Sequence, residues 1–408
     1  MKNVVVIGGG PAGIMAAGAA ARRGASVTLL EKNDRLGRKL YITGKGRCNI
    51  TNASDPETLI QNVATNARFM YPSFYAFGSD DVIRFFKDLG LVTKVERGGR
   101  VFPASDKSSD VVDALGAFLK KARVNTRLGC KARGVLIKNG KVIGVKTASG
   151  ETVGADAAVV STGGMSYPLT GSDGDGYRFA KESGHTISPP RPSLTPIIVK
   201  ERFDLEGLSL RNVEITAKIL KKIVYKSMGE MVFTARGVSG PLILTLSRVI
   251  IGKYGLNPEI NIDLKPALTE RELDARVLRD FTDRANRDFG NGLDGLLPRK
   301  IIPAVIDVCD IPPGKKIRDI TKEERAGLVR ALKGFKLTAV GSGGFDEAIV
   351  TKGGVNVSEV KPATMESRLV GGLYFAGETL DVDGFTGGYN LQIAFSTGWA
   401  AGDSAGGD

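Results

Sequence analysis

The stretch Val4-Val5-Val6-Ile7-Gly8-Gly9-Gly10-Pro11-Ala12-Gly13 decides the fold. Its short apolar run is typical of a buried strand, and the Ala-rich residues that follow, up to position 23, predict a helix. Residues 26–30 predict a second strand, which leads directly into Glu31. The glycines at 8, 10 and 13 therefore fit the GxGxxG fingerprint in the strand–turn–helix context that it requires, with an acid at the end of the next strand. This pattern predicts a βαβ unit that binds a dinucleotide.

Each position of the fingerprint has a physical role. Gly8 permits the tight turn, Gly10 lets backbone amides approach a pyrophosphate, and Gly13 lets the helix pack closely on the strand. Pro11 and Ala12 open the helix, whose N-terminus carries partial positive charge for the phosphates. Glu31 can accept hydrogen bonds from both ribose hydroxyls, which favours an unphosphorylated ribose, and Lys32 beside it is a further expected contact.

Length and composition bound the other possibilities. A chain of 408 residues, 42% hydrophobic and 25% charged, predicts two or three folded units without disulfide staples. No apolar run reaches the roughly 18 to 20 residues that span a bilayer, and the three distant cysteines suit a reducing compartment, so we expect a cytoplasmic protein with no membrane partner. The single histidine, His185, argues against a multi-histidine metal centre, and we expect no metal. We expect His185 itself to be a surface or hydrogen-bonded histidine.

Net charge is +13, and the basic excess lies outside the C-terminal segment, where residues 345–408 hold 3 basic and 9 acidic side chains. Such a balance can attract nucleic acid, anionic lipid or anionic substrates, but for a chain of this size solvated surface lysines and arginines are the preferred explanation.

The order of patterns predicts several domains. A Pro-rich stretch at residues 189–196 marks the end of a first αβ unit that begins at residue 1. Alternating runs then predict a β-rich domain over residues 191–265, and capping-box starts at Thr269 and Thr321 predict a helical domain over residues 266–335. Residues 336–408 are again β-like and end in a helix from Tyr389.

Glycine clusters elsewhere indicate which dinucleotide is bound. Thr162-Gly163-Gly164 and Gly377-Glu378 each follow an expected strand, and an extended cofactor needs contacts from several segments. An acid placed like Glu378 can bind ribityl hydroxyls, so these clusters favour FAD. The string Gly341-Ser342-Gly343-Gly344 lacks the third glycine of a fingerprint, which argues against a second Rossmann domain for NAD(P)H. Cys48 has no cysteine partner at disulfide-reductase spacing, so we do not expect thiol exchange and expect Cys48 to pack against the flavin.

Several strings together resemble one family. They are Gly37-Arg38-Lys39, residues 44–52 (GKGRCNITN), residues 99–103 (GRVFP), residues 162–172, Ser239-Gly240-Pro241, residues 364–367 (TMES), and residues 377–392. On these strings the chain resembles the BaiN-like FAD-binding flavoproteins, also labelled aminoacetone-oxidase-like NAD(P)/FAD-dependent oxidoreductases.

The resemblance implies an α/β fold: a Rossmann-like, glutathione-reductase-like FAD domain in two segments, residues 1–190 and 336–408, interrupted by the inserted β-rich and small helical domains. It also implies that residues 37–52 and 387–392 line the flavin. One departure is visible, because the family usually carries a histidine where this chain has Ala235.

The start of the final helix has a physical reason to face the flavin. A helix N-terminus aimed at the N1 and C2 carbonyl side of the ring stabilises the negative charge that reduction places there. The full set of expected cofactor contacts is Gly8, Gly10, Pro11, Ala12, Gly13, Glu31, Lys32, Arg38, Lys39, Gly46, Arg47, Cys48, Asn49, Thr51, Thr162, Gly163, Gly164, Gly377, Glu378, Gly388, Tyr389, Asn390, Leu391 and Gln392.

Two residues are candidates on the substrate side, Tyr167 as a proton donor and Arg236 as the partner of an anionic group. We expect an FAD-dependent oxidoreductase that moves hydride between flavin N5 and a small organic substrate, an enone or an amine, with NAD(P)H as a transient donor. Two alternatives remain: an RNA-associated, tRNA-modifying-like flavoprotein, and a flavin sensor without turnover. One Trp and 7% aromatic residues offer few stacking platforms for RNA, which makes nucleic acid the weaker alternative.

Overall fold

The structure is a computed structural model that describes residues 1–407. The chain forms two units, one made of residues 1–192 with the C-terminal segment from Phe345, and the other made of Ser193–Gly344. Each unit has its own hydrophobic core. None of the described helices is long and apolar enough to cross a bilayer.

A parallel five-stranded sheet is the centre of the first unit, in the order β19-β10-β1-β2-β6. Its strands are β1 (Asn3–Ile7), β2 (Ser26–Leu30), β6 (Asn125–Arg127), β10 (Ala157–Val160) and β19 (Leu373–Phe375). Val4 to Ile7 are at most 3% exposed, because a parallel sheet of this kind is covered on both faces. The expected βαβ unit and the Rossmann-like fold are confirmed.

Helices and small sheets surround this centre. The helices of the first unit are α1 (Pro11–Arg22), α2 (Pro56–Gln61), α3 (Tyr71–Ala76), α4 (Ser79–Asp88), α5 (Ser108–Lys121), α6 (Asp175–Glu182) and α11 (Tyr389–Gly406). The small sheets are β3-β5-β4 (Thr51–Asn52, Arg100–Pro103, Thr93–Glu96), β7-β8-β9 (Ala132–Lys138, Lys141–Thr147, Thr152–Gly154) and β11-β18 (Ile187–Ser193, Val350–Val355).

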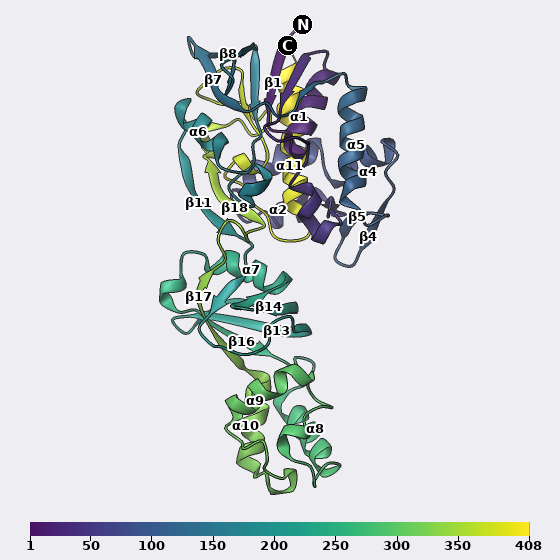
Figure 1. Ribbon diagram of the computed structural model, residues 1–408, viewed down its shortest axis with the longest axis vertical. Helices are drawn as coiled ribbons and strands as arrows, with labels where there is room; N and C mark the ends of the chain where they lie inside the picture. Colours follow the sequence, from purple (N-terminus) through teal and green to yellow (C-terminus); the bar gives the residue numbers. More distant parts are fainter. Residues whose placement is uncertain (408) are drawn as a thin grey trace. The chain divides into compact units, whose positions relative to one another are not determined.

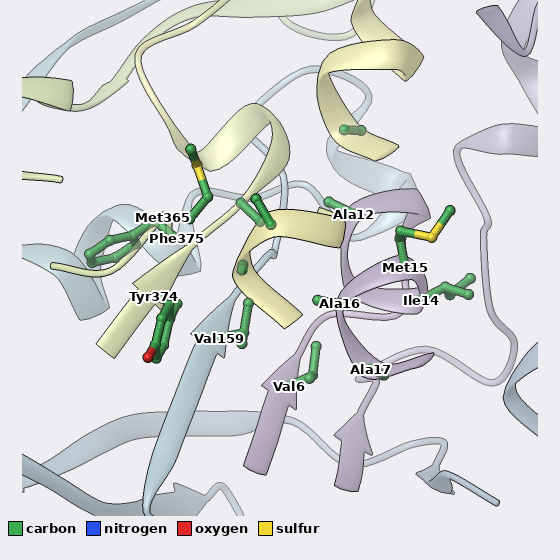
Figure 2. Close-up of a cluster of buried hydrophobic side chains, with 14 of the residues drawn as sticks. Val6, Ala12, Ile14, Met15, Ala16, Ala17, Val159, Met365, Tyr374 and Phe375 are labelled. Carbon is green, nitrogen blue, oxygen red and sulfur yellow. The ribbon is translucent and has the colours of Figure 1, made fainter. Parts of the chain in front are cut away.

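Helix α1 is held between the sheet and α11 by contacts in which glycines replace side chains. Figure 1 shows α11 beside α1 and β1, and Figure 2 shows the small α1 side chains Ala12, Ala16 and Ala17 in the core with Val6 and Val159. A Cβ added to Gly398, Gly402 or Gly406 of α11 would lie 2.3, 2.1 or 2.6 Å from the carbonyl oxygen of Ala12, Ala16 or Ala20. The two helix backbones are therefore in contact along two turns, although the residues that meet are far apart in the sequence.

The second unit is built on a closed six-stranded barrel in the order β12-β15-β14-β13-β16-β17. Its strands are β12 (Ile197–Val199), β13 (Ser209–Ile219), β14 (Lys222–Thr234), β15 (Gly237–Ser239), β16 (Glu259–Asp263) and β17 (Phe335–Ser342), and its helices are α7 (Pro241–Ile250), α8 (Glu270–Thr282), α9 (Ile302–Cys309) and α10 (Lys322–Lys333). Barrel and helices share one hydrophobic core. The capping boxes Thr269–Glu272 and Thr321–Glu324 start α8 and α10, as the sequence predicts.

The structure differs from the expected domain limits at residue 336. The sequence predicts that the second FAD segment begins at residue 336, but the residues of β17 pair with β16 and β12 and close the barrel. The physical reason is its alternation: Phe335, Leu337 and Ala339 are fully buried in the barrel core, whereas Lys336 and Val340 are exposed. The helical segment is likewise part of the same core and not a separate body.

The glycine contacts of α11 lead to a testable prediction. Gly402→Ala places a methyl group against the α1 backbone and should lower the free energy of unfolding by about 1–3 kcal/mol, the usual cost of overpacking. Gly116→Ala in α5 is the matched control, because a Cβ there meets nothing within 4 Å. It should raise stability by about 0.5–1 kcal/mol through helix propensity. Urea denaturation followed by circular dichroism measures both, and equal stability of the two variants would contradict the packing described.

Candidate functional site

The glycine loop after β1 is closed on one side and open on the other. A Cβ on Gly13 would lie 1.8 Å from the Gly8 carbonyl oxygen, and one on Gly8, at φ +105°, would lie 2.6 Å from the Ser161 oxygen. By contrast, a Cβ on Gly10 would meet nothing within 4 Å. The start of α1, with Pro11 in its first turn, therefore faces open space with the positive end of the helix dipole.

Glu31 is held over this loop at the end of β2. Its side chain is 6% exposed; Oε2 accepts from the Gly9 amide at 2.6 Å, and Oε1 accepts from the amide and the side chain of Asn33 at 2.8 and 2.6 Å. These donors fix the carboxylate beside the glycine loop, as ribose recognition requires. Arg38 donates to Asn33 Oδ1 at 3.0 Å and so supports the same carboxylate indirectly. Lys32 forms ion pairs with Asp173 and Asp175.

Lys39 and Glu378, which were expected separately as cofactor contacts, bind each other. Lys39 Nζ lies 2.8 Å from Glu378 Oε2 and 2.6 Å from Ser166 Oγ. Glu378 Oε1 accepts from Ser166 Oγ and from the Thr351 amide, both at 2.7 Å. Because Oε1 takes two donors and Oε2 one, the carboxylate keeps acceptor capacity on its Lys39 side for a hydroxyl group. The network joins four segments at the carboxyl ends of β10 and β19.

The glycines of these segments bring the backbone close to its neighbours. Gly163 and Gly377 have φ values of +76° and +68°, and a Cβ on Gly164 would lie 2.4 Å from Thr351 Oγ1. The Gly377 amide donates to Thr397 Oγ1 of α11 at 2.9 Å. Within residues 1–407, the buried Thr162 Oγ1 has no hydrogen-bond partner. A buried hydroxyl of this kind is an orphan that a bound polar group would satisfy.

Residues 46–52 are the next segment that the sequence predicts to contact the flavin. Cys48 is fully buried at φ +59°, and this burial raises the pKa of its thiol to about 12, so it is an uncharged packing residue. The preceding Gly46 adopts φ +83°. The Arg47 side chain has partners within the chain. It forms ion pairs with Glu96 and Asp106, and its guanidinium lies 4.1 Å from the centre of the Phe102 ring.

The segment then connects to the start of α11. Gly388 caps the helix at φ +102°, and a Cβ there would lie 2.3 Å from the Thr51 carbonyl oxygen. With its amide oriented to satisfy its neighbours, Asn49 accepts from the Gly388 amide at 3.0 Å and donates to the Thr51 carbonyl. Contacts of Gly388 with Asn49 and Thr51 therefore hold the start of α11 in place. A helix N-terminus fixed in this way can stabilise negative charge.

Side chains in the first turn of α11 have structural partners. Gln392 is fully buried, bonds Thr51 Oγ1, and donates to the Phe77 carbonyl at 3.1 Å. Asn390 bonds both backbone groups of Gly384. Tyr389 is buried and Leu391 half-buried. Both side chains therefore have partners within the chain, and we propose that the backbone amides of this turn make its contact with the flavin.

These residues fit FAD. An open glycine loop with Glu31, an orphaned hydroxyl at Thr162, an acid with spare acceptor capacity at Glu378, and a rigid helix start at Gly388 all lie in the first unit. When bound, FAD supplies two-electron chemistry at its isoalloxazine ring, while the chain supplies position and charge.

The other candidates lie as follows. Tyr167 is half-buried at φ +51°, and burial, with a smaller effect of Glu347, raises the pKa of its hydroxyl. Arg236 lies in the barrel unit, where it lines a cavity of about 300 Å³. His185 is buried, and its Nε2 lies 2.8 Å from Ser367 Oγ. Among residues 1–407, no cluster of three or more His, Cys, Asp or Glu could hold a metal.

Ser166 and Thr351 are the members of the site that the sequence did not single out. Ser166 lies two residues after Gly164, and its place in the 162–172 string is the sequence feature that could have indicated it. Thr351 lies in β18, and nothing local marks it. Its role depends on the fold, because its amide meets Glu378 and its hydroxyl accepts from the amides of Met165 and Ser166.

Similar proteins support this assignment. Residues 2–404 match the family described as the HI0933-like protein Rossmann domain. The 3-dehydro-bile acid delta(4,6)-reductase of Clostridium scindens is 34% identical over 99% of both chains. The ribosomal RNA dihydrouridine synthase of Haemophilus influenzae is 30% identical over 97% of this chain and 96% of its own.

The fold also matches a solved structure. The alignment with the 3-ketosteroid delta1-dehydrogenase of Sterolibacterium denitrificans covers 100% of each chain, with a TM-score of 0.54 and 12% sequence identity. Fold, family resemblance and the expected class, an FAD-dependent oxidoreductase, are confirmed by these matches taken with the site. The chain belongs to the HI0933-like Rossmann-domain family.

Proposed function

We propose that this protein reduces a conjugated carbon–carbon double bond of a polycyclic enone, using FAD and a nicotinamide donor. The observation that carries the proposal is the convergence in one unit of the Gly10 loop with Glu31, the Lys39–Glu378 network and the Gly388 helix start. Together they have the chemistry to bind the ribose, pyrophosphate, ribityl and ring portions of one extended dinucleotide.

The residues of the chain have separable roles in this proposal. Glu31 and the start of α1 bind the adenosine diphosphate half, and Glu378 orients the ribityl chain with Lys39 holding its carboxylate. The amides at the start of α11 stabilise negative charge on the ring. Overall, the donor's hydride and one proton add across one double bond, and NAD(P)⁺ and the ketone with one double bond fewer are released.

Tyr167 is our proposed proton source. Its raised pKa keeps the hydroxyl protonated at neutral pH, so it can donate to the carbon next to the ketone. A substrate of the enone class is supported by the Clostridium scindens relative, whose name states that it reduces a 3-dehydro-bile acid.

A second candidate function is reduction of a pyrimidine in RNA. Two relatives, from Escherichia coli and Haemophilus influenzae, are named ribosomal RNA dihydrouridine synthases, and the net charge of +13 would favour an RNA substrate. The enone remains our first choice because the bile-acid reductase is the more similar of these relatives.

Removal of the Glu31 carboxylate tests the cofactor assignment. Glu31→Ala should purify largely colourless, because both ribose hydrogen bonds and the anchor of the Gly9 amide are lost. Glu182→Ala, which removes an exposed carboxylate from α6, is the control and should keep its flavin. Absorbance near 450 nm per mole of protein gives the occupancy, and full occupancy in Glu31→Ala would contradict the ribose role.

Anaerobic mixing tests the reaction. The yellow protein should lose its flavin absorbance with NADH or NADPH and regain it when a steroid 4,6-dien-3-one is added. Tyr167→Phe should lose the reoxidation step by roughly 100-fold, the usual contribution of a general acid, and retain the first step. Reoxidation by ribosomal RNA and not by the dienone would select the second candidate, and an absorbance that no donor bleaches would contradict both.

A further inference from the structure

Gln392 is a polar side chain in the core-facing part of α11. It is fully buried, and residues 393–397, which follow it on the helix, are buried as well. Its oxygen and both of its N–H groups are used: Oε1 accepts from the Thr51 hydroxyl, and Nε2 donates to the Phe77 carbonyl oxygen at 3.1 Å and to Ser396 Oγ at 2.9 Å. The amide therefore joins α11 to two segments that lie 341 and 315 positions away in the sequence.

Stability alone does not explain a buried amide at this position. Its hydrogen bonds within the protein mainly replace those that it made with water, and an apolar side chain of similar size packs there without that exchange. What the three bonds add is direction, because an apolar contact tolerates a shift of one segment past another and a set of hydrogen bonds does not. The amide is therefore suited to fix one arrangement of the segments that it joins.

The arrangement that Gln392 fixes is that of Thr51 against the start of α11. Thr51 is fully buried, and a Cβ on Gly388 would lie 2.3 Å from its carbonyl oxygen. The backbone amide of Gln392 donates to the Gly388 carbonyl at 3.1 Å and closes the first turn of the helix. Gln392 thus holds both sides of the contact, Gly388 through its backbone and Thr51 through its side chain. The amides of residues 389–391 precede this first bond and have no intrahelical partner.

We propose that Gln392 is a positioning residue that sets the reduction potential of the bound flavin. The inference rests on the proposed function, which places the flavin ring at residues 46–52 and at the start of α11. By holding Thr51 on Gly388, the Gln392 side chain keeps the free amides of residues 389–391 where they stabilise negative charge on the reduced cofactor. Without this bond the two segments shift apart, the charge is stabilised less, and the potential falls.

Anaerobic reduction of the flavin-containing protein with dithionite, in the presence of a reference redox dye, measures the potential. Gln392→Met keeps the length of the side chain and removes its three hydrogen bonds. It should lower the preference for reduced over oxidised flavin by about 3- to 10-fold, part of the effect of a helix N-terminus on a nearby charge. For a two-electron couple, this change makes the potential about 15–30 mV more negative.

The other end of the same bond gives a second test. Thr51→Val removes the hydroxyl that donates to Gln392 and keeps the branched shape, so it should shift the potential in the same direction. Thr51→Ser keeps the hydroxyl and should keep the potential of the unmodified protein. The double variant Thr51→Val with Gln392→Met should shift the potential no further than Gln392→Met alone, because both changes break one bond.

Ser396→Ala is the matched control. It removes a buried hydrogen bond to the same Phe77 carbonyl, one helical turn further along α11, and leaves the bond between Thr51 and Gln392 in place. Ser396→Ala and Gln392→Met should both lower the thermal midpoint of unfolding, but the potential should change only in Gln392→Met. A merely structural role of Gln392 would lower both midpoints and leave both potentials unchanged.

The outcomes separate this inference from the proposed reaction, because the titration needs neither a nicotinamide nor an enone. An unchanged potential in Gln392→Met and in Thr51→Val, or a shift of equal size in Ser396→Ala, would overturn the inference. If Gln392→Met loses its flavin, Thr51→Val decides. A shifted potential in a protein that no nicotinamide reduces leaves the inference standing and rejects the reaction, and an unchanged potential in a protein that reduces a dienone does the reverse.

Discussion

The first unit depends on the direct contact of α1 with its neighbours through glycine. At its start, Gly13 lies against the Gly8 carbonyl, and along its length the α1 backbone touches Gly398, Gly402 and Gly406 of α11. A side chain at any of these positions would push α1 away from its neighbours, because carbonyl oxygens cannot yield as a flexible side chain does. This packing decides where the N-terminus of α1 points, and hence where a pyrophosphate can bind.

The same packing brings the N-terminal and C-terminal segments of the chain together at the candidate site. Helix α11 is capped by Gly388, which lies against Thr51, and it runs along α1. The two helix starts that we propose to bind the ring and the phosphates therefore belong to one packed pair. The Lys39–Glu378 network adds charge-assisted bonds between further segments of the same unit. The candidate site is thus a set of backbone amides and two carboxylates, those of Glu31 and Glu378, each held by hydrogen bonds within the unit. Such preorganisation is how a protein stabilises charge on a bound group.

Much of this could be predicted where the signal is local. The Val4–Gly13 stretch and Glu31 specify the βαβ unit because strand, turn and helix signals are adjacent, and the capping boxes at Thr269 and Thr321 are defined by residues three apart. Features that depend on tertiary contacts could not be predicted. Strand β17 belongs to the barrel because β12 and β16 pair with it. The pairing of Arg47 with Glu96, and of Gln392 with the Phe77 carbonyl, likewise joins residues that are distant in sequence. No spacing rule reports these partners.

The central claim is that separated segments of one unit hold a complete dinucleotide, including its adenosine half. Titration of flavin-free protein with FAD and, separately, with FMN tests it most directly. FMN lacks the ribose and phosphate that Glu31 and the Gly10 loop would bind, so the account predicts one FAD per chain and an affinity for FMN at least about 100-fold lower, the loss of two or more charge-assisted contacts. Equal affinities for the two flavins would contradict it.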